Sequence, residues 1–137
     1  MEKEEYVEIG KLDKILFDKI GQILITDEVI FTYERRIHVE TKRIKLFEEV
    51  KDVLADVVYA PDYIYTDWNN RDDTLILIKS LGETVKLNVV LKIALANDEK
   101  HTKNSIITMI KIGQKSFNKI QKNKRENLLY ERIDKKE

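Results

Sequence analysis

Residues 74–95 read Thr-Leu-Ile-Leu-Ile-Lys-Ser-Leu-Gly-Glu-Thr-Val-Lys-Leu-Asn-Val-Val-Leu-Lys-Ile-Ala-Leu. Two runs rich in aliphatic and β-branched residues, 74–81 and 85–95, flank a short polar turn that contains Gly82. This pattern is typical of a β-hairpin, because glycine allows the tight reversal that joins two antiparallel strands. The stretch therefore predicts an antiparallel sheet, and the other elements are placed around it.

The remaining elements are a set of helices and further strands. A stripe of apolar residues at helical spacing predicts one core-facing helix over 46–58, and Pro61 marks its end. The other expected helices are 12–20, 33–42 and a basic helix at 115–125, and the other expected strands are a short one at 28–31 and then 62–67, 105–112 and 128–130. Because the chain shows no regular βαβ alternation, we expect an α+β fold, with N-terminal helices packed on a four- to five-stranded, mostly antiparallel sheet.

Composition bounds the class of protein. The 137 residues, 42% hydrophobic and 36% charged, fit a single domain spanning 1–137. There is no cysteine, which excludes disulfides and thiolate zinc sites, and the two histidines, His38 and His101, are too few for a multi-histidine metal site. We therefore expect no metal and no cofactor. No apolar run reaches the roughly 18 residues of a membrane span, so we expect a cytoplasmic protein without membrane contact.

Charge is balanced overall but unevenly distributed. Twenty-five basic residues match twenty-five acidic ones, yet residues 35–43 carry a net charge of +3 and residues 100–137 a net charge of +7. From Lys100 to Arg125 there are eight cations and no acid. Such basic islands in an otherwise acidic chain would steer a polyanion such as RNA towards them. The alternative interpretation is an ordinary lysine-rich surface in contact with solvent.

The expected helix at 33–42, with Thr32 as its expected N-cap, carries the first candidate site. Arg35, His38 and Lys42 are three and four residues apart and so project from one side of it, with Ile37 and Ile44 expected to mark a buried stripe beside them. A neutral imidazole can act as a general base at neutral pH, and neighbouring cations can hold a phosphate. The alternative is a half-buried structural histidine that hydrogen-bonds to a backbone carbonyl.

The second candidate site opens the expected strand at 105–112. Strand alternation places Asn104, Ile106 and Thr108 on one face and Ser105 on the other. Ser105 and Thr108 can therefore serve one site only if a β-bulge intervenes.

Several short motifs occur in a fixed order along the chain. They are Ile25-Thr26-Asp27-Glu28-Val29-Ile30, Thr32-x-Glu34-Arg35-x-x-His38, Pro61-Asp62-Tyr63-Ile64, Lys103-Asn104-Ser105-Ile106-Ile107-Thr108 and Leu129-Tyr130. In this order they resemble the phage- and mobile-element-borne nuclease domains that are grouped with barnase, EndoU, the tRNA-cleaving colicins and RelE. The resemblance extends over about residues 9–132. It implies a toxin-like, metal-independent endoribonuclease, with RNA (tRNA included) as substrate and an immunity or antitoxin protein as partner.

The resemblance, read together with the charge pattern, assigns roles to individual residues. His38 is the general base or acid, Arg35 and Lys103 hold the phosphate, and Ser105 or Thr108 orients it. The expected catalytic residues are His38, Arg35, Ser105 and Thr108, and the expected substrate-binding residues are Glu34, Lys42, Lys103, Asn104, Lys115 and Tyr130.

The sequence departs from the family's pattern at two positions. Arg43 stands where the family often has a second histidine, and Tyr33 stands where it tends to have aspartate. If the site needs two imidazoles, this copy is slow or inactive. The alternative function is therefore a catalytically inactive nucleic-acid-binding or phage-assembly accessory domain of the same fold. A third is a protein that engages a host factor.

Overall fold

The computed structural model describes residues 5–69, 71–95 and 103–133. Lys100, the first cation of the basic run, and His101, the second histidine, lie outside the described residues. The strands are β1 (Tyr6–Lys11), β2 (Glu28–Thr32), β3 (Tyr63–Thr66), β4 (Thr74–Ser80), β5 (Val85–Lys92), β6 (Asn104–Gly113) and β7 (Leu128–Glu131). The helices are α1 (Lys14–Lys19), α2 (Tyr33–Lys42), α3 (Leu46–Val50), α4 (Leu54–Tyr59) and α5 (Gln114–Asn123), followed by a short 3-10 turn at Arg125–Asn127.

All the described strands join one mixed sheet. It has seven strands in the order β1-β2-β6-β5-β4-β3-β7. The β2–β6 pair is parallel and the other neighbouring pairs are antiparallel. The predicted hairpin is confirmed as β4–β5, whose register runs from Thr74 opposite Lys92 to Ser80 opposite Lys86.

The expected fold class is correct only in being α+β. The prediction of N-terminal helices on a four- to five-stranded, mostly antiparallel sheet is wrong, because the sheet has seven strands and one parallel pair, β1 precedes the first helix, and α5 follows β6. The alternating pattern of β1 is interrupted by a bulge between Glu8 and Gly10. A Cβ at Gly10 would lie 3.3 Å from the Ala55 Cα of α4, so glycine allows α4 to approach β1 closely there.

The helices also differ in detail from the prediction. The expected helix at 46–58 is two short helices, α3 and α4, separated by a turn at 51–53. The predicted bounds of α2 are confirmed, as is its N-cap, where the Thr32 hydroxyl accepts a hydrogen bond from the Arg35 backbone N–H at 3.2 Å. The longest helices have ten residues, and none in the described part of the chain is long and apolar enough to cross a membrane.

The buried stripe predicted for α2 is wrong. Ile37 and Ile44 are 48% and 79% exposed, whereas Val39 is completely buried. The spacing of Ile37 and Ile44 indicated the wrong side of the helix as the buried one. The side that faces the sheet carries a single apolar residue, Val39, among charged residues, so it gives no apolar stripe in the sequence.

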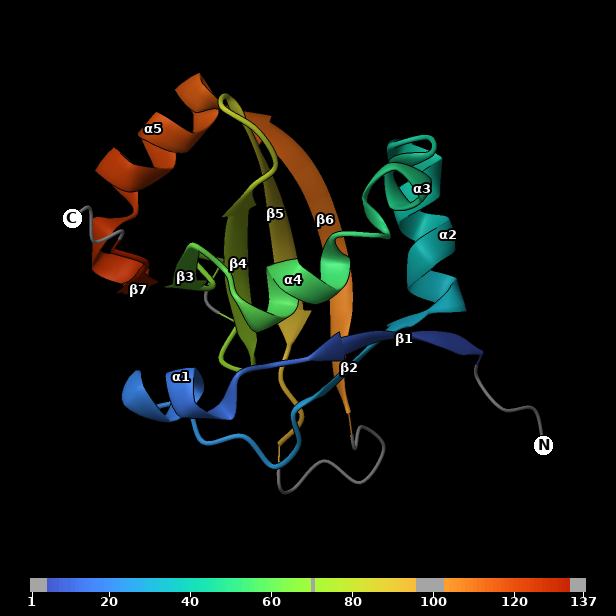
Figure 1. Cartoon of the computed structure of the whole chain (residues 1–137), viewed down its shortest axis with the longest axis horizontal. Helices are drawn as coiled ribbons and strands as arrows, with labels where there is room; N and C mark the ends of the chain where they lie inside the picture. Colours follow the sequence, from blue (N-terminus) through green and yellow to red (C-terminus); the bar gives the residue numbers. More distant parts are fainter. Residues whose placement is uncertain (1–4, 70, 96–102, 134–137) are drawn as a thin grey trace.

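The two faces of the sheet are covered by different helices. The larger core lies on the first face, where α4 crosses the strands (Figure 1), and it includes residues of α1 and α3 and Val39 of α2. A smaller apolar cluster lies on the second face, where Phe117 of α5 packs with Tyr65, Ile76 and Ile78. Figure 1 shows α2 and α3 beside β6 and α5 at the other end of the sheet, near β3 and β7.

Candidate active site

Helix α2 begins where β2 leaves the sheet. A depression of about 340 Å³ follows one side of this helix, and all of its lining residues belong to α2: Glu34, Arg35, Ile37, His38, Thr41 and Lys42. The His38 side chain is exposed, and within the described part of the chain its ring has no hydrogen-bond or ion-pair partner. The depression thus presents an accessible imidazole beside two cations and one carboxylate.

The orientation of this depression follows from the residues on the other flank of α2. Arg36 lies there, with its guanidinium 4.6 Å from the centre of the Phe47 ring of α3. Since successive residues of a helix are rotated by about 100°, His38 projects from the flank opposite Arg36. Helix α3 packs on the first face of the sheet, so the His38 flank faces away from that layer.

A β-bulge in β6 decides the placement of the two hydroxyl candidates. The register between β5 and β6 shifts by one residue, which leaves Ile107 as the extra residue of β6. Ile106 and Met109 are both completely buried in the core of the first face. Ser105 and Thr108, their neighbours in the strand, therefore both point to the second face. The condition under which these hydroxyls could share one site is met.

Asn104 is fixed by backbone groups on both sides of it. It is completely buried, and its Oδ1 accepts a hydrogen bond from the Ala94 N–H at 2.9 Å. Its Nδ2 donates to the carbonyl oxygens of Thr26 and Glu28 at 2.9 and 3.0 Å. This amide therefore ties the start of β6 to β2 at their parallel pairing, and its proposed contact with substrate remains a prediction.

Lys103 lies next to this junction, near the edge of the sheet. Its Nζ donates to Glu28 Oε1 at 3.2 Å and lies 5.5 Å from the centre of the Tyr6 ring. The hydrogen bond to Glu28 raises the pKa of Lys103 above its usual range, so the ammonium stays charged. A phosphate bound at Lys103 would compete with Glu28.

The structure brings some of the predicted site residues together and separates others. Glu34, Arg35, His38 and Lys42 share the α2 depression, and Lys103, Asn104, Ser105 and Thr108 lie along the neighbouring strand β6. Lys115 is exposed in the first turn of α5. Tyr130 lines a separate cleft of about 410 Å³, together with Leu16 and Pro61. Lys115 and Tyr130 thus lie away from the α2 depression.

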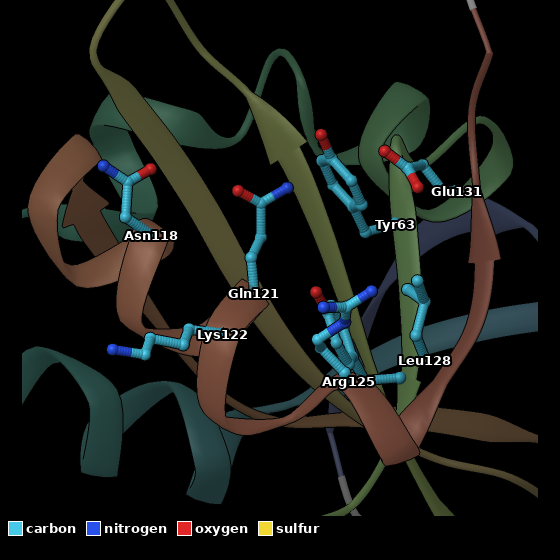
Figure 2. Close-up of a pocket in the computed structure, with 8 residues that line it drawn as sticks. Tyr63, Asn118, Gln121, Lys122, Arg125, Leu128 and Glu131 are labelled. Atoms are coloured by element: carbon cyan, nitrogen blue, oxygen red, sulfur yellow. The ribbon is translucent and has the colours of Figure 1, made fainter.

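A larger hollow, of about 630 Å³, lies between α5 and the strands β3 and β7 (Figure 2). It is lined by Tyr63, Tyr65, Asn118, Gln121, Lys122, Arg125, Leu128 and Glu131. In the sequence, its cations stand out only as members of the basic run. The remaining lining residues come from three separate segments, and no local pattern predicts that these segments meet.

Taken together, these features suit acid–base chemistry on a phosphate ester, the chemistry of nucleases. In the described residues, no group of three or more His, Cys, Asp or Glu side chains is placed to hold a metal ion. The family model described as "phage-Barnase-EndoU-ColicinE5/D-RelE like nuclease2" matches residues 2–131. The chain belongs to this nuclease family, which confirms the resemblance found in its motifs. No curated protein and no solved structure gives a significant match.

Proposed function

We propose that the protein is a metal-independent ribonuclease that cleaves RNA by transesterification. The ribose 2′-oxygen attacks the adjacent phosphorus as its proton passes to a base, the bond from phosphorus to the 5′-oxygen breaks, and the leaving oxygen takes up a proton from water. The products carry a 2′,3′-cyclic phosphate and a 5′-hydroxyl. This reaction needs proton transfer and stabilisation of negative charge, both of which side chains can supply.

The observation that carries this proposal is the position of His38 in the α2 depression. The imidazole is exposed and lies with Arg35 and Lys42 around one hollow. In the proposed reaction, His38 removes the proton of the 2′-hydroxyl, and the two cations stabilise the charge that develops on the phosphate.

The β6 residues contribute on the second face of the sheet. The bulge at Ile107 turns the Ser105 and Thr108 hydroxyls to the same side, and α2 directs His38 away from the first face. We assign these two hydroxyls to orienting the phosphate by hydrogen bonds. Lys103 supplies a further cation near the edge of the sheet. When RNA binds, its ammonium leaves the ion pair with Glu28 and pairs with a phosphate instead.

Cleavage of total RNA by the pure protein in EDTA tests the proposal. We expect cleavage to continue in the chelator and the products to end in 2′,3′-cyclic phosphate. Activity abolished by EDTA and restored by Mg²⁺ or Mn²⁺ would contradict the proposal and indicate a carboxylate-based nuclease instead.

One observation favours a second candidate, a nucleic-acid-binding domain without chemistry. Arg43 replaces the second histidine that the family often has, and its backbone N–H closes α2 by donating to the Val39 carbonyl at 2.8 Å. Expression of the wild type and of His38→Ala in cells separates the candidates. An active toxin should be hard to express without a neutralising partner protein, and the substitution should relieve this toxicity. A binding domain should show no difference.

A further inference from the structure

We infer that the hollow between α5, β3 and β7 binds one nucleotide of single-stranded RNA, as a subsite separate from the α2 depression. The inference rests on the proposed function, because it takes RNA as the substrate. The volume of the hollow, about 630 Å³, falls within the range of about 300–1,000 Å³ that is typical of sites for small molecules.

The hollow has two chemically different walls. Asn118, Gln121 and Lys122 line the hollow from α5, and Tyr63 and Glu131 line it from β3 and β7. Figure 2 shows Gln121 between α5 and Tyr63, and the Lys122 side chain pointing away from Tyr63. The α5 wall carries amides and positive charge, and the opposite wall carries a carboxylate. A phosphate is therefore attracted to the α5 wall and repelled from Glu131.

The cations that line the hollow from α5 and from the 3-10 turn after it are available to a ligand. Lys122 and Arg125 are exposed, and neither forms an ion pair with a described residue. Of the other cations of the same basic run, Lys111 is paired with Glu49 and Lys124 lies 5.8 Å from the centre of a tryptophan ring. Lys115 and Lys119 do not line the hollow. Helix α5 contains no acidic residue. Lys122 and Arg125 are therefore the unpaired cations of the described basic run that line the hollow, and they mark the position of the phosphate.

The remaining lining groups suit an unpaired base. The Tyr63 ring and Leu128 offer apolar surface, with the Tyr63 ring 4.8 Å from that of Phe117. Gln121 can donate and accept hydrogen bonds, and Glu131 can accept from an exocyclic amino group. A base can present its edge to such groups only when it is unstacked and unpaired, which favours a single strand over a duplex.

The hollow can be occupied by the same RNA chain that reaches the Ser105 and Thr108 hydroxyls of β6. It adjoins Tyr65 and α5 on the second face of the sheet, to which Ser105 and Thr108 also point. Three strand spacings separate β3 from β6 in the sheet order, or roughly 14 Å at about 4.8 Å each. A single strand of a few nucleotides crosses this distance.

The test measures the affinity for a short single-stranded oligoribonucleotide with 2′-fluoro groups, which cannot be cleaved by transesterification. Kd is measured over a range of salt concentrations for the wild type, Lys122→Gln, Arg125→Gln and the matched control Lys119→Gln. Lys119 lies on the same helix, is exposed and does not line the hollow. Each pocket substitution should raise Kd and reduce the log–log salt slope by about 0.7, the value for one phosphate contact in a single strand.

The outcomes are decisive in either direction. The subsite is supported if Lys122→Gln and Arg125→Gln reduce the salt slope while Lys119→Gln leaves it unchanged. A weaker effect of the first two substitutions on the binding of duplex RNA supports it as well. Equal slopes for all three variants would overturn it and leave only a basic helix. Cleavage is measured separately with unmodified RNA, so loss of the proposed function would appear as absent cleavage while binding stays dependent on Lys122 and Arg125.

Discussion

Helices α2 and α5 have the same length but lie at opposite ends of the sheet and carry different groups (Figure 1). Helix α2 places an imidazole among cations and a carboxylate, and α5 carries only cations, amides and a hydroxyl on its exposed side. Proton transfer needs a group that titrates near neutrality, whereas affinity for a polyanion needs only fixed positive charge. The difference assigns chemistry to α2 and affinity to α5.

The two helices are attached to the sheet in a similar way. Each has a single buried anchor, Val39 in α2 and Phe117 in α5. Their other side chains are exposed or half-buried and hence available for contact with RNA. Substitutions on these outer surfaces should therefore change function without unfolding the protein.

The largest effect is expected for His38→Ala. Removal of a general base should reduce the cleavage rate by about 10²–10⁴-fold. The melting temperature should not change, because the ring is exposed and has no partner among the described residues. Thr41→Ala, in the same depression, is the matched control and should keep its activity. A much lower melting temperature with activity retained at low temperature would show that His38 is structural.

Asn104→Ala should act on stability instead. It leaves the Ala94 N–H and the Thr26 and Glu28 carbonyls without their buried partner, at a cost of about 2–4 kcal/mol in the free energy of unfolding. Urea unfolding measures this loss. Ser105→Ala, one residue further along β6, should leave stability nearly unchanged. Reduced cleavage by a fully stable Asn104→Ala protein would instead place this amide in contact with substrate.

Arg35→Gln sharpens the comparison within α2. Loss of one positive charge beside the phosphate should reduce cleavage by about 10–10²-fold. Arg43→Gln removes the same charge just beyond the end of the helix, outside the depression, and should have little effect. Steady-state rates of both variants on the same RNA make the comparison. Equal losses would mean that overall charge, rather than the depression, governs the reaction.

The smallest effect concerns Tyr65, which lines the hollow between α5, β3 and β7. Burial raises the pKa of its phenol above the ordinary value of 10.0, because the charged form is poorly solvated there. The contribution of the Tyr65 phenol to the free energy of unfolding is complete below pH 10 and is lost as pH rises through the pKa of the folded state. Tyr65→Phe should therefore unfold at higher pH than the wild type, as followed by circular dichroism. An identical alkaline transition in both proteins would contradict this account.

Local patterns predicted those parts of the molecule that depend on neighbouring residues. The β4–β5 hairpin followed from Gly82 between two apolar runs, and α2 followed from the Thr32 cap and helical spacing. That spacing also grouped Arg35, His38 and Lys42. In each case the deciding contacts lie within one turn or one hairpin.

Features that depend on distant segments could not be predicted in this way. The parallel pairing of Val29 with Asn104 joins residues far apart in the chain, and the bulge at Ile107 becomes visible only against β5. The α5 hollow combines Tyr63 with Arg125 and Glu131 from later segments. Register and packing between segments determine these features, and periodicity within a segment carries no information about them.

The assignment of chemistry to α2 and of affinity to α5 is tested most directly by measuring the single-turnover cleavage rate and Kd on one RNA in EDTA. The proteins compared are the wild type, His38→Ala and the double variant Lys122→Gln/Arg125→Gln. We predict that His38→Ala loses the rate and keeps Kd, and that the double variant raises Kd and keeps the rate at saturation. The account would be contradicted if the double variant lost the saturated rate as fully as His38→Ala, or if His38→Ala cleaved at the wild-type rate.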